Sequence, residues 1–366
     1  MRTDALDYDL PDDRIATTPA EPRDSARLML VRRDTGTVEH RRVADLPGLG
    51  VVGPGDLMLV NQTRVLPAYL AGQRDATGGR VSGLYLGGDA QGRWQVMLES
   101  RGTLTAGETL TLGDAGQANG IATIELLEAL GAGQWLAQLR GEDDTPSVLE
   151  RVGRTPLPPY IRKQRRRLGL DEVSDADTRR YNTVYAGSAG SVAAPTAGLH
   201  FTDRLLTELG AMGVGRAAVD LHVGIGTFAP VRSDTLEAHA MHEEWFSVPK
   251  QTLDAIGNTR AAGGRLFVVG TTTVRALESL PTDALDPGAY PDGVNATTDL
   301  FIHPDAGFSF RYTDRLMTNF HLPRSTLLAL VASLPGVGLD RLMDAYRQAV
   351  KERYRFYSYG DAMLVV

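Results

Sequence analysis

The sequence contains no cysteine in 366 residues, which narrows its chemistry at once. Without thiolates the chain forms no disulfide, no cysteine-ligated zinc site and no cysteine-held iron–sulfur cluster. Radical reactions that depend on such a cluster are excluded for the same reason, and so is catalysis by a thiol nucleophile.

Long apolar runs are also lacking. No segment approaches the roughly 20 consecutive apolar residues that a membrane-spanning helix needs. The first residues, Met1 to Asp4, include an acid and no apolar core of the kind found in secretion signals. We therefore expect a cytoplasmic protein without membrane contact.

An excess of positive charge is also lacking, because 45 Asp and Glu outnumber 38 Lys and Arg and the formal net charge is −7. An acidic chain is a poor non-specific binder of nucleic acids, since phosphates attract Lys and Arg, but a local basic patch is compatible with that balance. The remaining composition, 42% hydrophobic and 23% charged, is ordinary for a globular protein, and the length suffices for two domains.

Residues 65–140 alternate short apolar runs with Gly-rich turns. The runs lie at residues 81–86, 94–98, 109–112, 121–127 and 135–139. Strands at this spacing predict a small antiparallel barrel.

Elsewhere strands and helices alternate, as in α/β folds. We expect strands at residues 27–31, 57–61, 214–223, 265–269, 299–302 and 362–366, and helices at residues 203–213, 249–264, 273–280, 325–334 and 339–354. The predicted fold is a mixed-sheet α/β main domain, residues 1–63 and 150–366, into which a small antiparallel β-barrel of residues 64–149 is inserted.

Two histidines lie where such folds bind ligands. His200 belongs to a small, polar stretch, residues 191–202, that leads into a predicted helix whose free N–H groups suit a polar ligand. His222 stands at the carboxyl end of a predicted strand, before a Gly-rich turn at residues 224–226. Packed or capping histidines are the alternatives. The full dinucleotide fingerprint is missing, so no nicotinamide site is predicted.

Residues 269–278 read as strand, glycine, three threonines and helix. We expect the threonines to cap the helix, while Thr272 and the free amides can hold a carboxylate or phosphate. Arg275 lies one turn into the helix and can add a two-point contact to such an anion. The alternative is a surface pair between Arg275 and Glu278.

Two further loops carry titratable groups. His321 and Arg324 flank Pro323, which restricts the loop before a helix; the alternative is a rigid loop with a solvated arginine. Glu243 is a possible general base, whereas Glu244 is more typical of an exposed acidic turn. The surrounding segment lacks His-Glu-x-x-His spacing, so no metal site is predicted.

The densest positive run covers residues 162–167 and precedes two tyrosines. Its basic residues are Arg162, Lys163, Arg165, Arg166 and Arg167. Basic side chains beside aromatics suit an RNA strand, although a solvated loop is the commoner fate of a charge run. A C-terminal aromatic run that includes Tyr357 can stack on a purine or fill the core.

Taken in order, these segments resemble the S-adenosylmethionine:tRNA ribosyltransferase-isomerases of queuosine biosynthesis. The resemblance is carried by residues 61–68, 157–161, 181–186, 191–202, 221–228, 270–279, 318–328 and 354–363. The barrel segment adds little to it.

The resemblance implies a reaction. The ribosyl part of S-adenosylmethionine is transferred to 7-aminomethyl-7-deazaguanine at the tRNA wobble position and rearranged, which gives epoxyqueuosine and releases adenine and methionine. It implies no metal and no cofactor, because S-adenosylmethionine is consumed, and we expect a monomer whose partner is tRNA. A tRNA-binding protein without catalysis and an S-adenosylmethionine-dependent tRNA methyltransferase are the alternatives.

This chemistry needs a base for the carbon beside the sulfonium, an acid for the departing adenine and a clamp for the methionine carboxylate. The base and acid are expected among His200, His222, His321 and Glu243, without assignment between them. Thr272 and Arg275 fit the clamp. The further substrate-binding residues expected are Asn61, Arg64, Arg324 and Tyr357, and the basic run is expected to bind tRNA.

Overall fold

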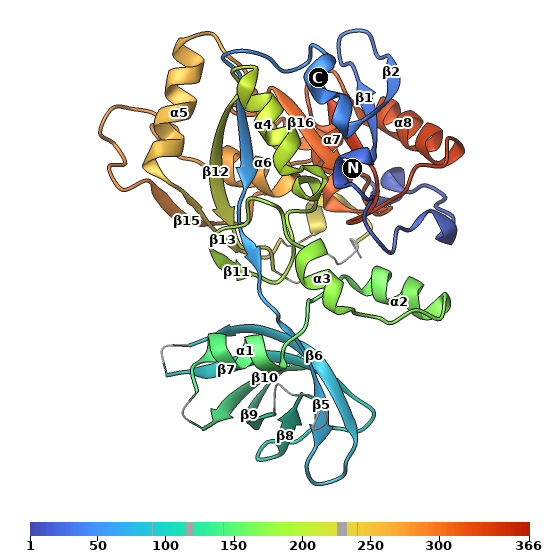
Figure 1. Cartoon of the computed structure of the whole chain (residues 1–366), viewed down its shortest axis with the longest axis vertical. Helices are drawn as coiled ribbons and strands as arrows, with labels where there is room; N and C mark the ends of the chain where they lie inside the picture. The colour runs from blue at the N-terminus through green and yellow to red at the C-terminus, as the bar shows by residue number, and fades with distance from the viewer. Residues whose placement is uncertain (90, 114–120, 142, 225–232, 240) are drawn as a thin grey trace. The chain divides into compact units, whose positions relative to one another are not determined.

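The computed structural model describes residues 1–89, 91–113, 121–141, 143–224, 233–239 and 241–366 (Figure 1). They form two compact units. The first comprises Met1–Arg64, Pro159–Glu172 and Asn182–Val366, and the second comprises Val65–Pro158 and Val173–Tyr181.

A nine-stranded mixed sheet forms the centre of the first unit, in the order β15-β13-β12-β3-β14-β16-β17-β1-β2. Its strands are β1 (Arg27–Val31), β2 (Val38–Arg42), β3 (Leu57–Asn61), β12 (Gly215–Leu221), β13 (Glu244–Val248), β14 (Leu266–Val269), β15 (Val294–Thr298), β16 (Arg315–Asn319) and β17 (Ala362–Val365). The neighbours β12, β3, β14 and β16 run parallel, so their carboxyl ends meet at one edge. Strands β3, β14 and β16 are buried along their whole length, as expected for parallel strands covered on both faces.

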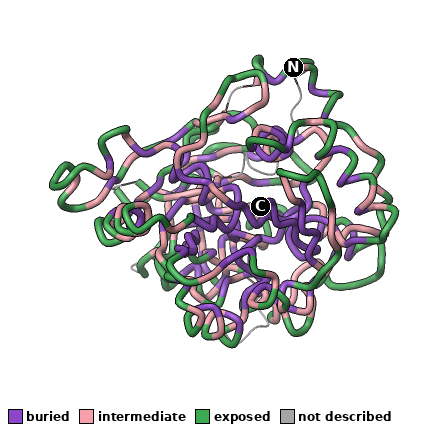
Figure 2. The backbone as a smooth tube through the Cα atoms, turned by 90° about the horizontal axis from the view of Figure 1, so that it is seen from above, coloured by how far each residue is buried: buried purple, intermediate pink, exposed green. Residues whose placement is uncertain are grey.

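Helices cover both faces of this sheet. Alternate strand residues such as Leu59 and Val268 share one apolar core with α5 (Lys250–Ala261), α6 (Thr271–Glu278), α7 (Thr326–Ala332) and α8 (Leu339–Lys351). Their neighbours Met58 and Val269 face the opposite core with α4 (Asp203–Ala211). Figure 2 shows buried backbone at the centre and exposed backbone mainly in outer loops.

The remaining elements of the first unit are short. They are α2 (Pro159–Arg167), the strand β11 (Ala189–Ser191) and the 3-10 helices η1 (Thr3–Leu6), η2 (Asp12–Arg14), η3 (Arg23–Ser25), η4 (Val43–Gly48), η5 (Thr196–His200), η7 (Leu236–Ala238) and η8 (Pro304–Ala306). A further two-residue strand, β4 (Arg64–Val65), follows β3.

The second unit is a closed antiparallel barrel, ordered β10-β7-β6-β5-β8-β9. Its strands are β5 (Tyr69–Arg74), β6 (Arg80–Gly88), β7 (Arg93–Ser100), β8 (Thr109–Leu112), β9 (Ala122–Gly131) and β10 (Gln134–Arg140), and its helices are α1 (Thr145–Val152) and α3 (Asp175–Arg180). The buried Trp94 indole of β7 donates to Thr145 Oγ1 at the start of α1, at 2.9 Å. The boundary expected between residues 149 and 150 therefore falls inside a helix that is bonded to the barrel.

The predicted fold class, a mixed α/β sheet with a small antiparallel barrel, is confirmed. The strand expected at residues 299–302 is wrong, because β15 ends at Thr298. Beyond it the backbone bonds to side chains: Leu300 N–H donates to Thr298 Oγ1 at 3.1 Å, and Leu300 O accepts from Arg275 Nε at 3.1 Å. No helix in the described part of the chain is long and apolar enough to cross a membrane.

Candidate functional site

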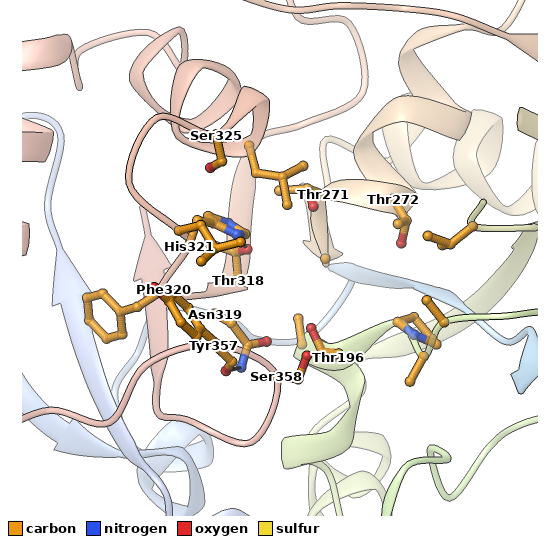
Figure 3. Close-up of a pocket in the computed structure, with 18 of the residues that line it drawn as sticks. Thr196, Thr271, Thr272, Thr318, Asn319, Phe320, His321, Ser325, Tyr357 and Ser358 are labelled. Carbon is orange, nitrogen blue, oxygen red and sulfur yellow. Dashed lines mark hydrogen bonds between the residues drawn. The ribbon is translucent and has the colours of Figure 1, made fainter. Parts of the chain in front are cut away.

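A cavity of about 80 Å³ lies among loops that follow the parallel strands β14 and β16 (Figure 3). It is lined by Tyr160, Ala193, Ala194, Pro195, Thr196, Ala197, Val223, Gly270, Thr271, Thr272, Thr318, Asn319, Phe320, His321, Leu322, Ser325, Leu327, Tyr357 and Ser358. None of these described lining residues is Asp, Glu, Lys or Arg. The cavity therefore offers hydroxyls, one amide, aromatic rings and one histidine, but no formal charge when that histidine is neutral.

The turn from β14 into α6 forms one wall. Gly270 is the helix N-cap at φ 90°, a backbone conformation that side chains disfavour, and its N–H donates to Met317 O at 2.8 Å. The predicted capping by threonines is wrong, because no side chain caps α6. Thr273 Oγ1 instead donates back to Val269 O at 2.6 Å, while Thr272 lines the cavity.

Asn61 ends β3 beside this turn and braces it. Its Nδ2 donates to Leu221 O at 3.0 Å and lies 3.4 Å from Thr272 Oγ1, while its Oδ1 accepts from Thr63 N–H at 3.1 Å. The structure thus places Asn61 as a brace between strand ends and not in the cavity lining. Arg64 is exposed, and its backbone N–H donates to Ser188 O at 2.8 Å.

His321 lines the cavity from the loop after β16. Its Nε2 lies 2.9 Å from Thr318 Oγ1, and its backbone N–H donates to the Tyr346 hydroxyl at 2.9 Å. Burial lowers the pKa of His321 to about 3, so the imidazole is neutral at pH 7. Arg324 in the same loop is absent from the lining, and its buried Nε has no hydrogen-bond partner among the described residues.

His200 reaches the same loop cluster through Asn319. It ends η5, it is buried, and its Nε2 lies 3.2 Å from Asn319 Nδ2. Burial lowers the pKa of His200 to about 3, and the positive charges of Arg355 and Arg23 act in the same direction. His200 and His321 are thus both neutral groups near the end of β16, and His321 alone of the two lines the cavity.

His222 lies outside the cavity lining. Its ring centroid is 4.5 Å from that of Trp245, and a Cβ added to Gly190 would lie 2.1 Å from its Cε1. Burial lowers the pKa of His222, and the nearby Asp220 carboxylate opposes that shift. Of the Gly-rich turn expected after it, residues 225 and 226 lie outside the described residues.

Glu243 and Glu244 reverse their expected environments. Glu243 is exposed and Glu244 is buried, so the expectation of an exposed turn at Glu244 is wrong. Glu244 forms a buried ion pair with Arg275 and accepts a hydrogen bond from Gly224 N–H at 2.9 Å. A buried cation requires such a partner, and this pairing across the fold was not visible in local sequence.

The guanidinium of Arg275 binds to other groups of the protein. Besides the Glu244 pair, Nε donates to Leu300 O at 3.1 Å and Nη2 to Thr298 O at 3.4 Å. The alternative of a surface pair with Glu278 is wrong, because Glu278 is buried and accepts from other groups, among them Thr313 Oγ1 at 2.7 Å. Arg275 is absent from the cavity lining, and its clamp role stays a prediction.

Tyr357 lines the cavity in a left-handed conformation, at φ 71°. Its ring lies 4.6 Å from that of Tyr160, whose hydroxyl is 2.6 Å from Ser358 Oγ. Burial raises the pKa of Tyr160 to about 12, and burial also raises that of Tyr357. Both rings are therefore neutral aromatic walls.

The basic run forms helix α2, not a loop. Arg165 is buried and donates from Nε and Nη2 to Thr17 O, at 3.1 and 2.9 Å, so its guanidinium is turned into the protein and its contact with RNA phosphates stays a prediction. Arg166 pairs with Glu172 at 2.6 Å and Arg167 with Asp12, on exposed side chains. Lys163 is exposed and Arg162 is half-buried.

A family model described as "Queuosine biosynthesis protein" matches residues 3–365. The chain belongs to this family. It is 46% identical over 370 residues to the S-adenosylmethionine:tRNA ribosyltransferase-isomerase of Gloeobacter violaceus, covering 100% of this chain and 96% of that one. The protein of the same name from Rubrobacter xylanophilus is 45% identical over 366 residues, covering 100% and 98%. The crystal structure of S-adenosylmethionine tRNA ribosyltransferase from Thermotoga maritima matches with a TM-score of 0.52 at 34% identity, covering 99% and 100%.

This membership confirms the predicted family and its enzymatic character. Sequence reasoning missed two features of the site, the contact between the rings of Tyr160 and Tyr357 and the place of Asn319 in the cavity lining. The signal available in the sequence is that Asn319 is a polar residue at the carboxyl end of a strand, where α/β folds bind ligands. Among the described residues no group of three or more His, Asp or Glu is placed to hold a metal ion.

Proposed function

We propose that this chain is an S-adenosylmethionine:tRNA ribosyltransferase-isomerase. It transfers and isomerises the ribosyl moiety of S-adenosylmethionine onto 7-aminomethyl-7-deazaguanine at the tRNA wobble position, giving epoxyqueuosine, adenine and methionine. The observation that carries the proposal is end-to-end similarity, at 41–46% identity, to proteins of this name. The cavity at the ends of the parallel strands supports it, because α/β sheets bind ligands there.

His321 is the side chain best placed to take the proton from the carbon beside the sulfonium. It lines the cavity, and its imidazole is neutral at pH 7, which is the form that can accept a proton. His200 contacts the cavity through Asn319, and Glu243 and His222 are absent from the lining. We therefore assign proton abstraction to His321 and positioning to His200.

The exposed positive face of α2 supports a role in tRNA binding. Lys163, Arg166 and Arg167 are exposed there, and the last two already pair with surface carboxylates. Exposed pairs are weak, so phosphates can replace the carboxylates at little cost. Each such contact adds to the salt dependence of binding.

Product analysis tests the function. The protein is incubated with S-adenosylmethionine and tRNA that carries 7-aminomethyl-7-deazaguanine, and the small products are separated by chromatography. Adenine and methionine in equal amounts support the proposal. S-adenosylhomocysteine would mean methyl transfer, and no product would mean binding alone; either result overturns it.

The assignment of His321 as the base is tested by comparing kcat between variants. His321→Gln removes the ring nitrogen and should lower kcat by about a hundredfold or more, within the range typical of general-base catalysis. His40→Gln, on the exposed edge strand β2, is the matched control and should leave kcat unchanged. Equal kcat in wild type and His321→Gln would refute the assignment.

A further inference from the structure

The side-chain amide of Asn319 retains one hydrogen-bonding group without a partner. Asn319 ends β16 and is 3% exposed. Its Nδ2 donates to Tyr357 O at 3.0 Å and lies 3.2 Å from His200 Nε2. Its Oδ1 is buried and has no hydrogen-bond partner among the described residues. A buried acceptor without a donor is costly, which points to a donor on a ligand.

The orientation of this amide is fixed by its neighbours. The Tyr357 carbonyl can only accept, so the amide nitrogen must face it. Neutral His200 can accept the second N–H through Nε2. A flipped amide would place its oxygen against the Tyr357 carbonyl oxygen and lose that bond. Oδ1 is therefore a dedicated acceptor, and Figure 3 shows Asn319 on the same side of the cavity as Thr196 and Ser358.

The walls around Asn319 suit a neutral planar group. No Asp, Glu, Lys or Arg occurs among the described lining residues, so a carboxylate would find no charged partner in this lining. The rings of Tyr160 and Tyr357 supply aromatic surface, and Thr271 and Ser358 supply hydroxyls. Apolar walls with a few placed polar groups are typical of nucleobase-sized ligands.

We propose that this cavity binds a purine-type base and that Asn319 Oδ1 accepts a hydrogen bond from its exocyclic amine. The inference rests on the proposed function, which brings two such bases to the protein: the adenine of S-adenosylmethionine and the deazaguanine of tRNA. A site built around an amine rejects the analogue that lacks it, because the buried acceptor is then left unpaired. Asn319 is thus a specificity-determining residue.

The test removes the amine from the ligand and the acceptor from the protein, singly and together. For S-adenosylmethionine, kcat/KM is compared with that of its 6-deamino analogue. For RNA, kcat/KM is compared between anticodon stem-loops that carry the deazaguanine with and without its 2-amino group. Each pair is measured with wild type, Asn319→Ala and Asn319→Ser, the second of which keeps a small polar side chain at this position.

For each protein, the discrimination is the ratio of kcat/KM for the ligand with the amine to kcat/KM for the ligand without it. For one ligand pair we expect this ratio to be about tenfold or more larger in wild type than in either variant. That pair identifies the bound base. Deamination also changes the leaving group, but this effect is the same in every protein and cancels when the ratios are compared. If Asn319 had only a structural role, its substitution would lower kcat/KM equally for both ligands of a pair and leave the ratio unchanged. Asn258→Ala, on the exposed side of α5, is the control and should keep the wild-type discrimination.

Equal discrimination by wild type and both Asn319 variants, for both ligand pairs, would overturn the inference while the proposed function stands. Absence of adenine release from the wild-type enzyme would overturn the proposed function, and this inference with it. The two failures are therefore distinct in the same data.

Discussion

Arg275→Lys separates a structural role of this arginine from a substrate clamp. The guanidinium has three contacts inside the protein: the buried Glu244 carboxylate and the carbonyls of Leu300 and Thr298. A lysine ammonium keeps the charge but cannot span all three. Hydrogen bonds that involve a charged group contribute about 1.5–3 kcal/mol each, and removing one partner of a buried pair costs about 3–5 kcal/mol. With the charge retained, we expect the free energy of unfolding to fall by about 2–4 kcal/mol.

Urea denaturation followed by circular dichroism measures this loss. The matched control is Arg347→Lys, because Arg347 pairs with Asp344 on the surface at 3.1 Å, with side chains 64% and 76% exposed. That substitution should change the free energy of unfolding by less than about 0.5 kcal/mol. Both variants replace arginine by lysine, one in a buried ion pair and the other in an exposed ion pair.

An unchanged unfolding midpoint in Arg275→Lys would refute this reasoning. If the midpoint is unchanged and KM for S-adenosylmethionine rises about tenfold or more, the guanidinium acts on the substrate and the Glu244 pair is incidental, a charge-assisted contact being worth about 1.5–3 kcal/mol. A lower midpoint with unchanged KM in the folded protein would assign Arg275 to the scaffold.

Three further predictions follow from burial and close contacts. Gly190→Ala should displace the His222 ring, which lies 2.1 Å from the added Cβ, and lower the melting temperature measured by calorimetry. Because burial lowers the pKa of His321 from 6.5 to about 3, stability is fully present above pH 6.5 and is lost as pH falls toward 3; urea titrations should show wild type losing about 2 kcal/mol more than His321→Asn between pH 7 and 5. Arg165→Gln should cost about 2–3 kcal/mol of unfolding free energy, whereas Arg166→Gln should cost less than about 0.5 kcal/mol and instead flatten the salt dependence of tRNA binding.

Local patterns were sufficient for most of the fold. The run at residues 57–61 is apolar until its last residue, as expected of a parallel strand covered on both faces, and it forms β3. Thr202 directly precedes the helix expected at residues 203–213 and is of a type favoured at N-caps; its Oγ1 accepts from Leu205 N–H at 3.2 Å at the start of α4. Each of these signals is contained in a segment of a few residues, so neither depends on contacts between distant parts of the chain.

Pairings across the fold could not be read in the same way. Glu244 and Arg275 lie 31 residues apart, and nothing in either segment shows that the folded chain brings them together. Arg165 resembles the exposed Arg166 and Arg167 in sequence, yet it is buried and donates to the Thr17 carbonyl. The fate of a charge depends on which partner the topology brings near it.

Residue type is also a weaker guide to a binding site than the hydrogen bonds that a side chain leaves unmade. Asn61 and Asn319 both end parallel strands of the same sheet, on either side of β14. The amide of Asn61 is engaged at both ends, because Oδ1 accepts from Thr63 N–H and Nδ2 donates to Leu221 O. In Asn319 the nitrogen is engaged by the protein and the buried oxygen is not. The first asparagine therefore stabilises the strand ends that shape the cavity, and the second is the one with an acceptor available to a ligand.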